Sequence, residues 1–197
     1  QLVALGLGDI NPAEYDSDTV WNYEVGSKNR LFDRRLSLNS SAYILKWKNI
    51  QQPVTLTCGG NFLDNLGSAT IKGFDVQAEL RPVDPLSIGV SVAYTHAQFD
   101  KTVFVSDTQV PGTQPVTKGD RLQGPPWRVT ANVQYDFDVA GMPSYVRADY
   151  QYASREPSSV YTNNPLNGLS FVRGYYVLRP NEFVSLRAGT EIDKLAL

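Results

Sequence analysis

Cysteine and histidine are almost absent from this sequence of 197 residues, and each shortage excludes a kind of site. The single cysteine, Cys58, rules out an internal disulfide framework and a multi-cysteine zinc site. A lone histidine, His96, argues against a histidine-rich metal centre. Neither residue lies in a local signature of a nucleophilic Cys–His pair. We therefore expect no catalytic residue, no bound metal and no cofactor, and we do not expect an enzyme.

Long apolar runs are also missing, so the sequence contains no candidate transmembrane helix. A formal net charge of −2 without a basic stripe argues against nucleic acid as a partner. No window shows a sustained 3.6-residue period with capping signals, so we expect little helix. The composition is 42% hydrophobic and 19% charged, and it includes 15 glycines, 12 prolines and 11 tyrosines. This mixture favours strands joined by turns.

Apolar and polar residues alternate with a period of two in seven segments, which predicts seven strands. The clearest is 127–137, where Trp127 and Val129 begin one face and Arg128 and Thr130 the other. In 36–49 the alternation blurs near Ser40 and Ser41, where a β-bulge would fit. The predicted strands are 20–28, 36–49, 73–80, 86–97, 127–137, 145–152 and 183–192.

The connections between these strands alternate between short and long. The short ones are 30–35, 81–85 and 139–143, and the long ones are 50–66, 99–126 and 154–181. Because antiparallel neighbours alternate in direction, all long connections fall at one end of the strands. Short periplasmic turns and long extracellular loops are typical of outer-membrane barrels, whose tilted strands need about 9–11 residues to span the bilayer. We therefore predict an all-β fold, an antiparallel transmembrane β-barrel segment of about seven long strands.

Polar residues on the alternate face are expected to line the lumen of this barrel. Asp75 and Glu79 share that face of one strand, as paired carboxylates for acid–base chemistry would, but we interpret them as part of a solvated wall. Aromatic residues near many strand ends suit the headgroup level of a membrane. The predicted lumen-facing residues are Glu24, Asp75, Glu79, Arg128, Asp136, Arg147, Asp149 and Arg187.

Arginines and aromatic residues in the long loops are the best candidates for contact with a ligand, because these side chains dominate many binding sites. The candidates are Phe104, Arg121, Arg155, Tyr161, Phe171, Arg173, Tyr175 and Tyr176.

Four segments, in this order and spacing, resemble motifs of TonB-dependent outer-membrane receptors. They are the strand–turn–strand of Val20–Lys28 and Leu31–Leu36, the strand Leu38–Gln51, the strand entry Gly67–Val76 and the lead Gly119–Trp127 into a later strand. Asp75 stands where the family usually has glutamate. The resemblance covers nearly the whole chain, from about residue 11 to 197.

This resemblance implies a barrel of about 22 strands with a plugged lumen. It also implies TonB-dependent, energy-coupled uptake of a scarce ligand that is siderophore-, cobalamin- or glycan-like. We interpret 1–197 as a partial barrel domain, without the plug, the TonB box and the final strands. Expected partners are outer-membrane lipid, a small transported ligand and, through the absent N-terminal part, TonB. The expected location is the outer membrane of a Gram-negative bacterium, as a multi-pass barrel.

Two other classes remain open from the sequence, a passive outer-membrane porin and a soluble β-sandwich binding module. The first and last strands are edges without a partner, so the isolated piece is expected to self-associate. The ligand itself is not indicated, and Cys58 could pair with a cysteine elsewhere in a longer chain or remain a free thiol.

Overall fold

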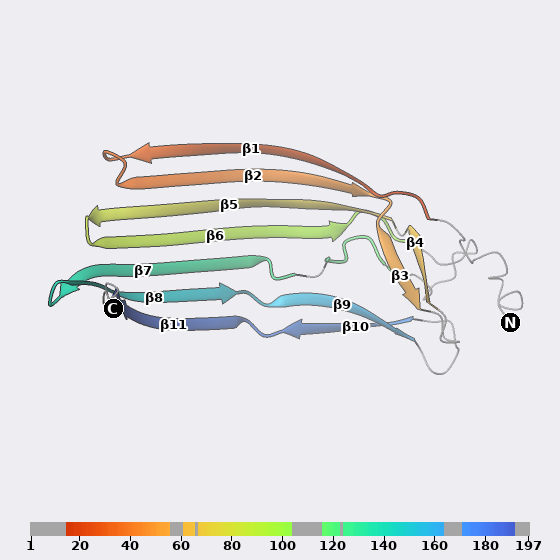
Figure 1. The fold of residues 1–197 in the computed structure, drawn as a ribbon. Coiled ribbons are helices and arrows are strands. Elements are labelled where there is room, and N and C mark those ends of the chain that lie inside the picture. Colours follow the sequence, from red (N-terminus) through yellow and green to blue (C-terminus); the bar gives the residue numbers. More distant parts are fainter. Residues whose placement is uncertain are drawn as a thin grey trace, which may run out of the picture.

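The computed structural model describes residues 15–55, 61–65, 67–103, 116–122, 124–163 and 171–191, and strands dominate it (Figure 1). Seven long strands form one antiparallel sheet in the order β1-β2-β5-β6-β7-β8-β11. Their bounds are β1 Thr19–Leu31, β2 Leu36–Lys48, β5 Ser68–Val83, β6 Leu86–Phe99, β7 Trp127–Val139, β8 Met142–Ala153 and β11 Asn181–Thr190. The predicted all-β fold with seven long strands is confirmed. Within the described part of the chain, no helix is long and apolar enough to cross a membrane.

The short connections lie where they were predicted, and they are even shorter than expected. Two of them contain only two residues, and one of these is Ala140–Gly141, which joins Val139 to its partner Met142. Both turn residues have positive φ, 53° and 82°. That backbone matches a type I′ turn, whose twist suits a two-residue hairpin. The turn fixes the register of β7 against β8.

Two of the long connections contain hairpins that the sequence pattern did not predict. Strands β3 (Gln51–Thr55) and β4 (Asn61–Asn65) pair within one, and β9 (Glu156–Asn163) and β10 (Phe171–Leu178) pair within the other. The second hairpin follows β8 and precedes β11, so it prolongs that strand pair beyond the sheet (Figure 1). The expectation of plain connections was wrong here, because short strands interrupted by proline and glycine show little alternation.

Ser40 and Ser41, where a β-bulge would fit, form no bulge, because both residues keep continuous register with β1 and β5. The register shifts instead between Leu80 and Val83, next to the β5–β6 turn. Alternation blurs in β2 for another reason. Leu45 and Trp47 share a face with polar residues such as Glu24, and Trp47 packs against a small apolar cluster at the loop end of the sheet.

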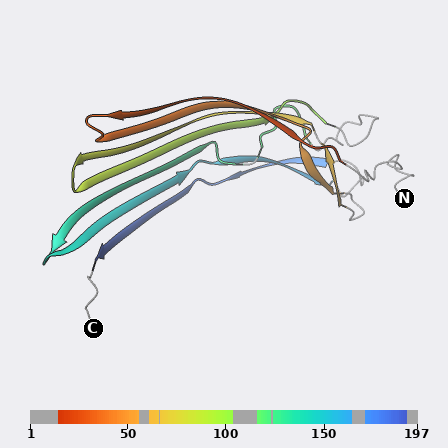
Figure 2. The same cartoon turned by 45° about the horizontal axis from the view of Figure 1, so that its top comes forward.

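One face of the sheet is apolar along its middle, and we call it the apolar face. A single row of directly paired residues crosses all seven strands on it. The row consists of Leu31, Leu36, Leu80, Ile88, Val133, Ala148 and Leu186. No second layer covers this face within the described residues, and Figure 2 shows a single curved sheet. Leu186 is 79% exposed and Val25 73% exposed, which is costly in water.

Aromatic side chains lie at both ends of this apolar band. Near the loops, Tyr94 and Trp127 have ring centroids 4.7 Å apart, and Phe74 lies 5.8 Å from each. Near the short turns, Tyr135 and Phe137 stack with centroids 6.1 Å apart. Trp127 and Phe137 lie on the same face of β7, about 34 Å apart along an extended strand. A tilt of about 40° reduces this to about 26 Å, close to the height of a barrel's lipid-facing band.

Candidate functional site

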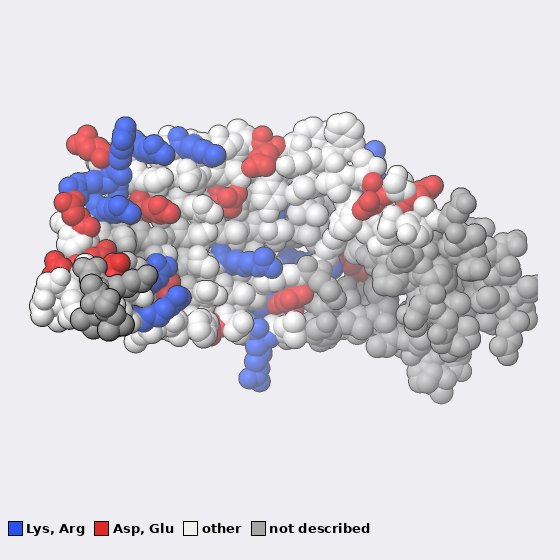
Figure 3. Space-filling model, in the orientation of Figure 1, with Lys and Arg blue, Asp and Glu red and all other residues white. Residues whose placement is uncertain are grey.

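The opposite face of the sheet, which we call the polar face, carries all eight residues that were predicted to line a lumen. Direct cross-strand partners lie on the same face, so the register connects them. One row crosses all seven strands one residue away from the apolar row. It consists of Arg30, Ser37, Glu79, Gly89, Asn132, Asp149 and Ser185. Figure 3 shows charges of both signs over one face of the sheet, most densely toward the short turns.

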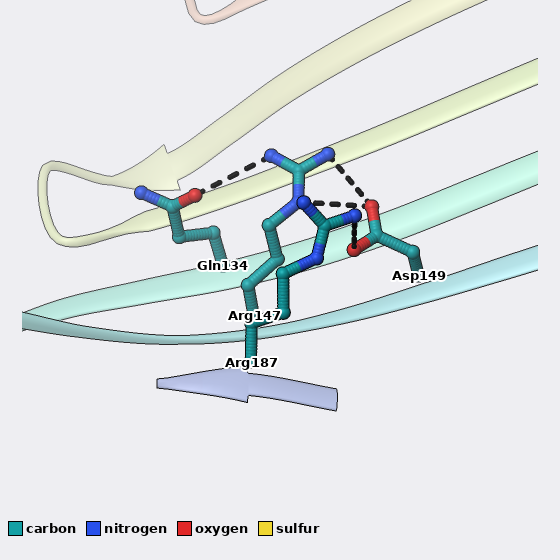
Figure 4. A network of polar contacts seen from close by, with 4 residues as sticks. All are labelled: Gln134, Arg147, Asp149 and Arg187. Atoms are coloured by element: carbon teal, nitrogen blue, oxygen red, sulfur yellow. Dashed lines mark hydrogen bonds and ion pairs between the residues drawn. The ribbon is translucent and has the colours of Figure 1, made fainter. Parts of the chain in front are cut away.

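Asp149 lies between two arginines on this face (Figure 4). Its Oδ1 accepts from Arg147, with distances of 2.9 Å to Nε and 2.8 Å to Nη2. Its Oδ2 forms an ion pair with Nη2 of Arg187 at 3.0 Å. Arg147 also donates to Oε1 of Gln134 at 3.4 Å. The Asp149 side chain is only 12% exposed. Arg147 contacts its Oδ1 through two nitrogens, whereas Arg187 makes a single contact with Oδ2 and is the less constrained cation.

Glycines on the polar face are covered by the side chains of their direct cross-strand partners. The side chain of Tyr43 lies over Gly73, that of Asn132 over Gly89 and that of Tyr145 over Gly189. A methyl group on Gly89 would lie 2.6 Å from the Asn132 amide nitrogen, and one on Gly189 would lie 2.7 Å from the Tyr145 ring. Glycine is therefore needed at these positions so that the partner side chain can lie against the backbone. The large partner side chain fills the space that a glycine leaves.

At the loop end, part of the middle connection folds against the sheet. Val116 is buried with Ile50, Ala69 and Phe99 in a small hydrophobic cluster. Phe99 N donates to Asp120 O at 2.8 Å, and Leu122 N donates to Ala97 O at 3.1 Å. The edge of β6 that extends beyond β7 is thus paired with loop backbone. This contact brings the chain around Arg121 next to the polar face.

A cavity of about 170 Å³ lies between this loop segment and the polar face. Arg121 and Arg128 both line it, together with apolar groups of Leu122, Pro125 and Pro126. Its described lining contains no carboxylate. Two guanidinium groups beside an apolar wall suit an anionic group on a small molecule, because guanidinium pairs with carboxylate or phosphate through two hydrogen bonds. Glu156, which is not part of this lining, accepts a hydrogen bond from the backbone N of the lining residue Gly124 at 2.8 Å.

The predicted ligand-contact residues divide into three groups. Arg121 lines the cavity, and Arg155 is exposed between β8 and β9. Phe104 lies outside the described residues, as does Cys58. The other five lie in the β9–β10 hairpin, in which Tyr161 pairs with Arg173. They are Tyr161, Phe171, Arg173, Tyr175 and Tyr176.

Sequence reasoning placed Arg128 on the polar face but did not place it beside Arg121. The signal was the pair of prolines, Pro125 and Pro126, which bends the chain between the two arginines. Among the residues that the structure describes, no group of three or more histidines, cysteines or carboxylates could hold a metal ion.

Residues 6–190 match the family model of the TonB-dependent receptor-like β-barrel. The fold is similar to the FrpB iron transporter from Neisseria meningitidis, F3-3 variant, with a TM-score of 0.59 and 17% identity over 88% of this chain and 24% of that one. It is also similar to the ferripyoverdine receptor of the outer membrane of Pseudomonas aeruginosa, with a TM-score of 0.58 and 15% identity over 87% and 21%. The chain thus spans about a quarter or less of these structures.

Proposed function

The chain belongs to the TonB-dependent receptor β-barrel family, as its motifs indicated, and we propose that it forms part of the barrel wall of an outer-membrane uptake receptor. The family comprises receptors and transporters of the Gram-negative outer membrane and not enzymes. The proposed domain, 1–197, contributes seven membrane crossings of a multi-pass barrel. The plug, the TonB box and the final strands are proposed to lie in other parts of a longer protein.

The observation that carries this proposal is the sorting of residues onto two faces. The apolar face, with aromatic residues about 26 Å apart at its two ends, faces lipid in our proposal. The polar face then faces the lumen, with Asp75, Arg128 and Asp149 among its charged residues. A wide aqueous or plugged lumen tolerates charges that a packed core would exclude.

Ligand contact is assigned to the long loops and to the cavity between Arg121 and Arg128. A ligand with acidic groups suits this pair, and we favour a siderophore-like ligand over a cobalamin- or glycan-like one. Two of the similar structures are an iron transporter and a ferripyoverdine receptor. Ligand passage is proposed to depend on TonB through the parts of the protein that carry the TonB box.

The experiment is uptake of radiolabelled ferripyoverdine by cells that carry the full-length gene. Uptake should be lost when the gene is deleted or TonB is removed. Arg128→Gln should weaken binding about tenfold or more, since hydrogen bonds to charged groups contribute about 1.5–3 kcal/mol. Arg30→Gln, at the other end of the polar face, is the matched control.

Uptake that persists without TonB would indicate a passive porin instead. A full-length protein that purifies as a monomer without detergent would indicate a soluble β-sandwich. The outer edges of β1 and β11 have no strand partner among the described residues, so the isolated piece should self-associate through them. A stable monomer in size-exclusion chromatography with light scattering would contradict this part of the proposal.

A further inference from the structure

Lysines gather at the loop end of the sheet, on the side of the apolar face. Lys72 of β5 pairs with Ile44, which pairs with Tyr23, so all three share that face. Lys46 and Lys48 of β2 lie on the same face and pair with Trp21 and Thr19. All three lysines are exposed. The face therefore changes from aromatic to cationic within a few residues.

The spacing places these ammonium groups at the level of lipid headgroups, if the apolar face lies in the membrane. Lys72 is two residues beyond Phe74 toward the loops, about 7 Å along the strand and about 5 Å along the membrane normal. We call Phe74, Tyr94 and Trp127 the aromatic belt. Lys46 pairs with Thr70, four residues beyond Phe74, so it lies about 10 Å beyond this belt along the membrane normal. The interfacial layer beyond the hydrocarbon is about 5–8 Å thick. Flexible lysine side chains can reach into it.

A hollow among these residues is suited to hold an anion. Lys46, Lys48 and Lys101 line a cavity of about 470 Å³ at the ends of β2, β5 and β6. Its only carboxylate within the described lining is Asp100, which accepts a hydrogen bond from Thr70 at 3.0 Å. With Lys72, these cavity lysines make four lysines at the loop end. None of the four forms an ion pair in the part of the chain that the structure describes. The hollow thus has more positive than negative charge.

We propose that Lys46, Lys48, Lys72 and Lys101 bind the phosphate groups of lipids in the membrane leaflet at the long-loop end. The inference rests on the proposed function, which places the apolar face in lipid. Lysine binds phosphate as a compact point charge, and the adjacent aromatic belt contacts the acyl chains of the same lipid. Each lysine near an anionic lipid surface strengthens binding about fivefold, which corresponds to about 1 kcal/mol.

The test uses the full-length protein and diphosphoryl lipid A presented in neutral detergent micelles. The double variant Lys46→Gln/Lys72→Gln should weaken lipid A binding about 25-fold, and Lys72→Gln alone about fivefold. Lys28→Gln is the matched control, because Lys28 lies on the polar face and pairs with Asn39. It should leave the affinity unchanged. Folding of every variant is checked by its heat-dependent shift in gel mobility.

Three results would overturn the inference. One is equal affinity for lipid A in the double variant and the Lys28→Gln control. Another is full competition by inorganic phosphate at the concentration of the lipid, which would mark a site for free anions. The third is wild-type binding that does not weaken with added salt, since exposed charge pairs are screened. Insertion of the wild type into phosphatidylcholine vesicles is measured separately, and failure there would contradict the proposed function instead.

Discussion

The hydroxyl of Tyr43 lies 2.9 Å from Oγ1 of Thr95, and this hydrogen bond holds the Tyr43 side chain across Gly73. Tyr43 pairs with Gly73 on β5, and Gly73 pairs with Thr95 on β6. The contact therefore spans three strands of the polar face. It shows how this face is packed without a second sheet, by large side chains lying over glycines of the neighbouring strand.

Alanine at Gly73 should destabilise the barrel by about 1–3 kcal/mol, because its methyl group would collide with Tyr43 and with the backbone of Tyr94. Gly26→Ala is the graded control, since its nearest contact would be 3.2 Å from Ser40 O. Tyr43→Phe keeps the aromatic ring over Gly73 and loses the hydrogen bond to Thr95, which should lower stability by about 1 kcal/mol. Urea unfolding of the lipid-reconstituted protein measures all three. Equal stability of the two alanine variants would contradict this packing.

Removing the carboxylate between Arg147 and Arg187 should destabilise the sheet by leaving two neighbouring cations without their shared anion. Asp149→Asn should therefore lower stability more than Asp136→Asn, because the Asp136 side chain accepts a hydrogen bond from the neutral Gln134 amide. Adding Arg187→Gln to Asp149→Asn should recover part of the loss. Additive effects in this double-mutant cycle would show that the two residues are not coupled.

Ile50 is 1% exposed and anchors the cluster that holds the middle connection against the sheet. Ile50→Ala should cost about 2–5 kcal/mol locally. Hydrogen exchange should quicken at the amides of Phe99 and Val103, which donate to Asp120 and Val116. The amides in the middle of β7 should be unaffected. Ile44→Ala, at a 41% exposed position of the apolar face, should not change loop exchange.

Ala140→Asn in the Ala140–Gly141 turn should raise the stability of the protein. The φ angle at this position is positive, and asparagine adopts such an angle more readily than alanine. We expect a gain of up to about 1 kcal/mol in urea unfolding. Gly141→Ala at the same turn should have the opposite sign, since φ there is 82°. A loss of stability in Ala140→Asn would argue against a type I′ turn.

Strand positions could be predicted because residues such as Val129, Ala131 and Val133 alternate strictly with polar neighbours. The prediction weakened where apolar residues lie on the polar face, as Leu45 and Trp47 do. Trp47 packs there against a cluster that includes a residue of a distant loop, and such a contact leaves no signal in the local sequence. It missed the β9–β10 hairpin, because these short strands contain Pro157 and Gly174 and show little alternation.

The candidate site was predicted less completely than the fold. The alternation of apolar and polar residues assigned Arg128 and Asp149 to the same face of the sheet, and the strand register confirms this. It could not show that Arg121 lies beside Arg128 or that Asn132 covers Gly89. Both relationships depend on cross-strand register and on how a loop folds back, and residue spacing along one strand contains neither.

The central claim is that the apolar face contacts lipid and the polar face an aqueous lumen, and β7 tests it most directly. Single cysteines at positions 129 to 134, in a full-length Cys58→Ser background, would carry spin labels in lipid bilayers. Oxygen should reach labels at Val129, Ala131 and Val133, and a water-soluble nickel chelate should reach those at Thr130, Asn132 and Gln134. Accessibility without a period of two, or with the opposite phase, would contradict the account.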